Sequence, residues 1–134
     1  MCRELAPPGP GWILLRTVYL SLDPYLRGRM VPGRSYAPRL EIGQVVVGDA
    51  VSQVVESRLA GFEPGDFVEG VTGWRDYGLS DGSNVRRVDP QLAPLSSLLG
   101  VLGKSGHAAY HGVVNIAAPR PGETVVISAA AGAV

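Results

Sequence analysis

Few side chains in this sequence of 134 residues have types and spacings that could support chemistry. Its two histidines, His107 and His111, are four residues apart, a spacing that can hold a metal ion on one face of a helix. The stretch between them lacks the glutamate of a zincin motif, and no third ligand is evident, so an exposed helix face is the better interpretation. The single cysteine, Cys2, excludes a disulfide framework and a cysteine-based metal cage.

The C-terminal sequence has the pattern of a nucleotide-binding loop. Residues 124–128 are a β-branched run that predicts a buried strand, and residues 129–134 are small and include a glycine. Such a loop normally opens the helix of a βαβ unit, where backbone N–H groups bind a pyrophosphate. Because no helix follows and a lone parallel strand has no partner, we expect the chain to be a fragment cut inside this loop.

Composition and charge limit the possible partners. Lys and Arg together number 12 and Asp and Glu together number 12, so a basic surface for nucleic acid or membrane binding is not expected. A hydrophobic share of 46% indicates a globular chain, and 18 glycines with 11 prolines favour many turns and short strands. The longest apolar stretch, residues 124–134, is far shorter than the roughly 20 residues that span a bilayer. We therefore expect a cytoplasmic location.

The segments that must position these loops are predicted to be mainly β-structure. Short runs rich in β-branched and aromatic residues, bounded by turn residues, are typical of strands, and their spacing favours a small antiparallel barrel or sandwich. The expected strands are residues 12–20, 44–47, 51–56, 67–71, 74–79 and 84–88.

Three helical segments are also expected. Residues 26–30 follow an Asp23-Pro24 turn and predict one helical turn, and residues 95–102 predict a short apolar helix. A further helix is expected from Gly106 onward, ended by Pro119. Its apolar stripe, at spacings of three and four residues, consists of Tyr110, Val113, Val114 and Ala117.

Residues 18–30 resemble the signature of a known family. Their sequence, Val-Tyr-Leu-Ser-Leu-Asp-Pro-Tyr-Leu-Arg-Gly-Arg-Met, is similar to that of the zinc-independent medium-chain dehydrogenases/reductases, namely the prostaglandin/leukotriene, 2-alkenal (double-bond) and bacterial curcumin-reductase-like enzymes. Residues 100–103, 106–110 and 121–134 resemble that family's domain junction and first cofactor loop. The resemblance implies a GroES-like barrel in residues 1–98, N-terminally incomplete, followed in residues 99–134 by a junction helix and the first strand and loop of a truncated Rossmann α/β domain.

The resemblance also implies a reaction. A parent protein, for which the resemblance allows a homodimer, would use NADPH to reduce the C=C bond of small α,β-unsaturated ketones or aldehydes. Hydride would reach the β-carbon, and hydrogen-bond donors would stabilise the enolate oxygen. The 134 residues alone would be inactive, because most of the dinucleotide site is missing. Two alternatives stay open: a non-catalytic truncated GroES-like module, and a quinone reductase of the same superfamily.

The residues at two positions argue against zinc. The zinc-dependent relatives need an early cysteine ligand and a Gly-His-Glu segment. Here the first place is taken by the Asp23-Pro24-Tyr25 turn, and the second reads Gly48-Asp49-Ala50. Neither offers a thiolate or an imidazole, so a hydroxyl or ribose donor would have to polarise the carbonyl instead of zinc.

The resemblance assigns candidate site residues, none of them a certain catalytic group. Tyr25 matches the family tyrosine that lines the substrate pocket, where its phenol can donate to a carbonyl; a half-buried turn tyrosine is the alternative. The other substrate-binding candidates are Val71, Thr72 and Trp74, although an aromatic residue after a strand is more often part of a core. The cofactor-binding candidates are Ala131, Gly132, Ala133 and Val134, whose backbone N–H groups would approach the pyrophosphate.

The sequence departs from the family pattern at the junction. The usual Gly-Met-Pro-Gly-Leu-Thr-Ala-Tyr reads Gly-Lys-Ser-Gly-His-Ala-Ala-Tyr over residues 103–110. Ala108 stands where a hydroxyl near the nicotinamide is expected. Lys104 and His107 are polar where apolar residues are usual, so they either tune the site or mark an inactive copy. Asp49 and Ser52 stand where glycines are more common.

Overall fold

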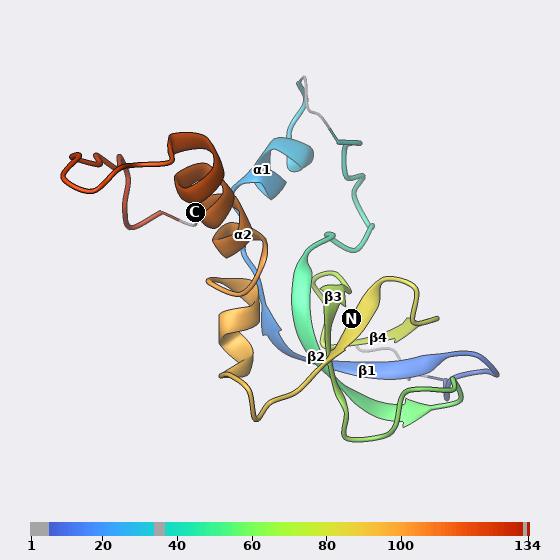
Figure 1. Ribbon diagram of the computed structural model, residues 1–134. Helices are drawn as coiled ribbons and strands as arrows, with labels where there is room; N and C mark the ends of the chain where they lie inside the picture. Colours follow the sequence, from blue (N-terminus) through green and yellow to red (C-terminus); the bar gives the residue numbers. More distant parts are fainter. Residues whose placement is uncertain (1–5, 34–36, 133) are drawn as a thin grey trace.

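The centre of the molecule is an antiparallel sheet. The computed structural model describes residues 6–33, 37–132 and 134. Its strands pair in the order β4-β1-β2-β3-β5, with each neighbouring pair antiparallel (Figure 1). Their bounds are Ile13–Leu20 (β1), Asp49–Ser57 (β2), Phe67–Val71 (β3), Tyr77–Ser80 (β4) and Val85–Val88 (β5). The prediction of a small antiparallel β domain is therefore confirmed.

The inward side chains of the central strands form the core. Ile13 and Leu15 alternate along β1 and pack with Val54 of β2 and Val68 of β3. Alternation places every second side chain on one face of a strand, which is why these short β-branched runs could be recognised. Partly buried side chains close the rim of this cluster, namely Leu59, Phe62 and Val85.

The two edge strands approach each other because the sheet curls. β4 and β5 lie at opposite ends of the strand order, yet only residues 81–84 connect them. The Ser80 hydroxyl donates to Oδ1 of Asn84 (3.0 Å), and Nδ2 of Asn84 donates to the carbonyl oxygen of Val71 (2.8 Å). We call this three-residue connection the seam. It ties the end of β4 to the end of β3 and gives the sheet a barrel-like curvature.

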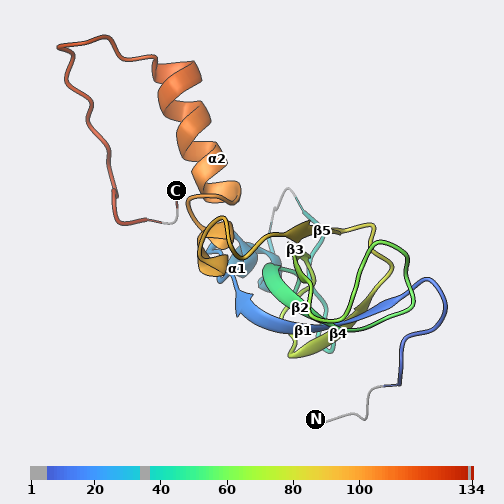
Figure 2. The same ribbon diagram turned by 60° about the horizontal axis from the view of Figure 1, so that its bottom comes forward.

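The helical elements are short and lie mostly outside the sheet. The helix α1 (Tyr25–Met30) follows Pro24 and has a buried Leu26, and η1 (Leu95–Leu99) is a 3-10 helix. The helix α2 (Lys104–Tyr110) continues into the π-helix η2 (His111–Ala117) and projects away from the sheet (Figure 2). It ends where Ala118 adopts a left-handed conformation (φ 43°) before Pro119, as expected. No helix in the described ranges is both long enough and apolar enough to cross a membrane.

Four predictions of secondary structure were wrong in whole or in part. The strand predicted over residues 74–79 begins only at Tyr77, as β4. The strand predicted over residues 44–47 does not form, because Val46 and Gly48 accept only isolated hydrogen bonds, from the N–H groups of Trp74 (2.8 Å) and Gly73 (3.1 Å). The strand predicted over residues 124–128 does not form either. That segment is irregular and exposed, and no strand in the described part of the chain pairs with it, so its β-branched residues lack the ladder that a strand needs. The helix expected to reach residue 102 ends at Leu99, before Gly100.

Candidate active site

Tyr25 is placed by a turn that passes directly into α1. The Ser21 hydroxyl donates to Oδ1 of Asp23 (3.0 Å), and the backbone N–H of Leu26 donates to the Asp23 carbonyl oxygen (3.1 Å). Because Leu26 is buried and anchors the helix, the neighbouring Tyr25 remains 39% exposed. It lies at a cavity of about 460 Å³. The cavity is lined by Asp23, Pro24, Tyr25, Lys104, Ser105, Ala108 and Val134.

Two departures from the family pattern meet at this cavity. Nζ of Lys104 lies 2.7 Å from each carboxylate oxygen of Asp49. Asp49 is only 6% exposed, whereas the Lys104 side chain is 68% exposed. The hydrogen bond to Asp49 raises the pKa of Lys104 above its usual 10.5 against the effect of partial burial, and the charges of Asp49, Tyr25 and Asp23 add to the rise. The lysine therefore carries a full positive charge at neutral pH.

Val71 lies in a neighbouring hollow rather than in the Tyr25 cavity. This second hollow, of about 380 Å³, is bounded by the ends of β3 and β5 and also includes Asp49 and Lys104. Lys104 thus lines both spaces and connects the two predicted substrate residues, Tyr25 and Val71. This arrangement agrees with a shared substrate site, but the binding role of each residue stays a prediction.

Thr72 and Trp74 are placed differently from Tyr25 and Val71. Thr72 is buried, and Trp74 is half-buried. The Trp74 indole packs on Gly48, because a Cβ added to Gly48 would lie 2.7 Å from the indole Nε1. Neither Thr72 Oγ1 nor Trp74 Nε1 has a hydrogen-bond partner in the described part of the chain. Neither residue lines the two spaces that Lys104 connects. Contact with substrate stays a prediction for both.

Two of the predicted cofactor residues, Ala131 and Gly132, lie in a tight turn. The N–H of Gly132 donates to the carbonyl oxygen of Ala129 (2.7 Å), and a Cβ at Gly132 would lie 3.0 Å from that oxygen. The residues around this glycine are small and exposed, which is compatible with the approach of a phosphate group to the backbone; dinucleotide binding here stays a prediction. Ala131 lies in the same turn, and Ala133 falls outside the described residues. Val134 lines the Tyr25 cavity.

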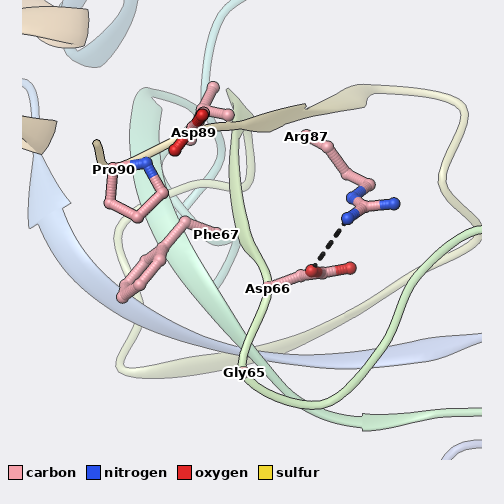
Figure 3. A pocket seen from close by; sticks show the side chains of 7 residues that line it. Gly65, Asp66, Phe67, Arg87, Asp89 and Pro90 are labelled. Atoms are coloured by element: carbon pink, nitrogen blue, oxygen red, sulfur yellow. Dashed lines mark hydrogen bonds and ion pairs between the residues drawn. The ribbon is translucent and has the colours of Figure 1, made fainter. Parts of the chain in front are cut away.

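A larger hollow lies at the opposite end of β3. It measures about 600 Å³ and is lined by Gly65, Asp66, Phe67, Arg87, Val88, Asp89 and Pro90 (Figure 3). Within it, Nη2 of Arg87 lies 3.1 Å from Oδ1 of Asp66, an ion pair that engages the one cationic side chain of the lining. This hollow contains none of the candidate site residues, so size alone does not identify the site.

The histidines do not converge on a metal centre. His107 and His111 are exposed on the continuous helix formed by α2 and η2, as the sequence interpretation expected. Nδ1 of His111 lies 2.9 Å from Nδ2 of Asn115. Among residues 6–33, 37–132 and 134, no three His, Cys, Asp or Glu side chains are grouped to hold a metal ion.

The Asp49–Lys104 pair is the contact that sequence reasoning missed. Each residue was recognised as a departure from the family pattern, but the two are 55 positions apart. The available signal was their opposite charge: two unusual residues of opposite sign near one predicted site can compensate each other.

The pair predicts how stability depends on pH. Because the pKa of Lys104 is higher in the folded chain than the usual 10.5, the pair stabilises the fold fully at lower pH and loses this effect as the pH rises through the folded value. We expect Lys104→Met to lower the free energy of unfolding by about 1 kcal/mol at neutral pH, a modest effect because the ammonium is exposed and screened. Urea unfolding on both sides of pH 10.5 should show the two proteins converging at high pH. If the difference in the free energy of unfolding between the two proteins did not change with pH, the pairing of Lys104 with Asp49 would be contradicted.

Comparison with known proteins shows close relatives. Residues 2–88 match the family described as the N-terminal domain of oxidoreductase. The chain is 49% identical over 131 residues to the NADPH-dependent curcumin reductase of Escherichia coli, covering 98% of this chain and 38% of that protein. It is 39% identical over 134 residues to rat prostaglandin reductase 1, and the match covers 98% of this chain and 39% of that protein. It is 38% identical over 131 residues to the NADP(+)-dependent 2-alkenal reductase of Nicotiana tabacum, and the match covers 96% of this chain and 38% of that protein.

A solved structure supports the same relationship. The crystal structure of CurA from Vibrio vulnificus in complex with NADPH superposes with a TM-score of 0.88 at 45% identity. The match covers 99% of this chain and 40% of CurA. The chain thus spans about two fifths of the length of the relatives it matches.

Proposed function

The chain belongs to the medium-chain reductase family of oxidoreductases, whose N-terminal domain matches residues 2–88, and from this premise we propose that it forms the substrate side of an NADPH-dependent enone and alkenal reductase. Its sheet is the expected GroES-like domain, as the likeness to CurA confirms. Within the proposal, residues 1–98 are the substrate-side barrel and residues 99–134 begin the cofactor domain. The cytoplasmic location and the homodimer stay predictions.

One observation carries the proposal. The predicted substrate residue Tyr25 and the predicted cofactor residue Val134 line the same cavity, together with Ser105 and Ala108 of the junction. These residues come from segments far apart in the sequence, and Figure 1 shows α1 beside the start of α2. A reductase must hold its hydride donor and its acceptor in contact, so a cavity between these segments is where the two would meet.

The chain's own residues would bind and polarise the acceptor. The phenol of Tyr25, which lines the cavity, would donate a hydrogen bond to the carbonyl oxygen of the enone. Bound NADPH supplies a hydride to the β-carbon, so that the π-electron pair moves toward oxygen, NADP(+) is left, and a proton from water reaches the α-carbon. The backbone around Gly132 would hold the pyrophosphate after the hydrogen bond from the Gly132 N–H to the Ala129 carbonyl oxygen has been broken. Pro24 and Ala108 line the cavity, where their apolar side chains would help to exclude water.

We propose that this reduction does not use zinc. At the position where the zinc-dependent relatives carry a histidine, Asp49 is engaged with the Lys104 ammonium at 2.7 Å. A cation must displace this ammonium before the carboxylate can serve as a ligand.

A chimera tests the function. In it, this chain replaces the matching segment of the Escherichia coli curcumin reductase, which supplies the rest of the polypeptide. We expect NADPH-dependent reduction of a simple enone, followed by the loss of NADPH absorbance. Tyr25→Phe should lower kcat by about tenfold, less than for a deeply buried oxyanion donor, because Tyr25 is partly exposed.

The control is Tyr77→Phe, which removes an equally exposed phenol (39%) from β4 and should leave kcat unchanged. Turnover should also survive dialysis against EDTA, and metal analysis should find no stoichiometric zinc. A folded chimera without enone reduction, or one that reduces only quinones, would refute the proposed function. Equal kcat values for Tyr25→Phe and the unmodified chimera would refute the role of Tyr25.

A further inference from the structure

Tight backbone packing fixes the position of Lys104. An added Cβ at Gly103 would meet the carbonyl oxygen of Leu98, and one at Gly106 would meet that of Val101. The N–H of Gly106 also donates to the Gly100 carbonyl oxygen (3.1 Å). Glycines at these positions let the turn close on itself, so α2 begins at one defined place.

Asp49 fixes the other end of the Lys104 side chain. It is the first residue of β2, it is opposite Val71 in the ladder, and its carbonyl oxygen accepts the N–H of Ser21 (2.9 Å). Its buried carboxylate holds Nζ of Lys104 through both oxygens. In the described part of the chain, Lys104 provides the only hydrogen bonds that this carboxylate receives. The ammonium is therefore held at one point between the Tyr25 cavity and the Val71 hollow.

The ammonium keeps hydrogen-bonding capacity. It has three N–H groups, of which the Asp49 carboxylate engages at most two, and no described residue accepts the third. The acidic environment keeps it protonated, which makes it a stronger donor than a neutral group. The charged and titratable groups that surround it are Asp49 of β2, Asp23 and Tyr25 at the start of α1, Glu69 of β3 and Arg86 of β5.

We propose that Lys104 is a catalytic residue of the acceptor site, whose ammonium donates a hydrogen bond to the carbonyl oxygen as that oxygen gains negative charge, and that Asp49 is its positioning residue. This inference rests on the proposed function. No proton is transferred in the step: the lysine remains protonated, the enolate oxygen carries the charge, and water protonates the α-carbon. The cation would thus provide in this chain the electrostatic stabilisation that zinc-dependent relatives obtain from their metal.

The competing explanation is that the ion pair only joins the junction to the sheet. A pair of variants separates the two roles. Lys104→Met leaves the buried Asp49 carboxylate uncompensated, whereas the double variant Asp49→Ala/Lys104→Met removes both charges and should recover stability. Lys104→Arg keeps a cationic donor at the same position.

In the curcumin reductase chimera, we expect kcat to fall at least about tenfold in Lys104→Met and to remain low in the double variant, although its melting temperature recovers. Lys104→Arg should recover most of kcat. The unmodified chimera is measured in parallel, so that loss of the proposed function itself would be seen separately. A double variant with the kcat of the unmodified chimera would overturn the inference, because the pair would then be structural.

A second measurement does not depend on turnover. p-Nitrophenol carries an oxygen that becomes negative on ionisation, and its absorbance distinguishes the two forms. We would titrate p-nitrophenol in the presence of the NADP(+)-loaded chimera. The pKa of p-nitrophenol should be about one unit lower in the chimera with Lys104 than in the Lys104→Met variant, since a nearby cation favours the anion. Identical titrations in the two proteins would overturn the inference.

Discussion

Replacing Gly70 with alanine is expected to lower the free energy of unfolding by about 3 kcal/mol, because the added methyl group has no space. Gly70 lies in β3 and pairs with Val85 of β5. Its Cβ would meet the carbonyl oxygen of Asn84 and lie 2.9 Å from Cα of Val85. Both atoms belong to backbone, so no side-chain rotation can relieve the overlap. β5 must move away from β3, and the seam at Asn84 must open.

Urea unfolding of the 134-residue chain measures this effect, and the matched control is Gly28→Ala. Gly28 lies in α1, where an added Cβ would meet nothing within 4 Å. Alanine there should stabilise the fold by about 0.5–1 kcal/mol, because it restricts the unfolded chain more than glycine does. If both variants behaved alike, the close approach of β3 to β5 would be refuted.

Ile13→Ala is expected to have a comparable effect, about 3 kcal/mol. Ile13 begins β1, is fully buried, and packs in the cluster with Leu15, Val54 and Val68. Removing three carbons from this site loses the transfer free energy of those atoms and leaves a cavity that the paired strands cannot close. For a domain whose total stability is of the order of 5–15 kcal/mol, this loss is large.

Two further substitutions calibrate the result. Ile13→Val should cost only about 0.5–1.5 kcal/mol, because it removes one carbon from the same site. Leu92→Ala, at an exposed position, should change the free energy of unfolding by less than about 0.5 kcal/mol. A cost for Ile13→Ala no larger than that for Leu92→Ala would show that the cluster around β1 is not the core.

Strands with a nearby antiparallel partner could be predicted from the sequence. β3 was found at its observed bounds, because residues 67–71 alternate between the two faces and pair on both sides. Residues 44–47 and 124–128 are richer in β-branched residues than β3 but form no ladder. Composition predicts the tendency to extend, whereas a strand exists only if another one supplies hydrogen bonds, and that is a property of the whole fold.

The site was predictable in part, and only through a resemblance. The signature in residues 18–30 pointed to Tyr25, which does lie at a cavity shared with the junction. The connection of this cavity to Val71 through Lys104 depends on the ladder between β2 and β3, which sets Asp49 opposite Val71. No local pattern encodes such a register, so the charged pair between the two candidate spaces was visible only in three dimensions.

The seam also bears on how the chain folds. β1 and β4 are distant in sequence, so joining them directly would close a long loop with a large entropic penalty. The link between Ser80 and Asn84 spans only four positions, and Asn84 in turn is bound to the end of β3. Once β2 and β3 form their hairpin, the seam holds the end of β4 near the end of β3, and β1 can then pair with β2 and β4 in one docking event. A single amide side chain thereby lowers the effective contact order of the topology.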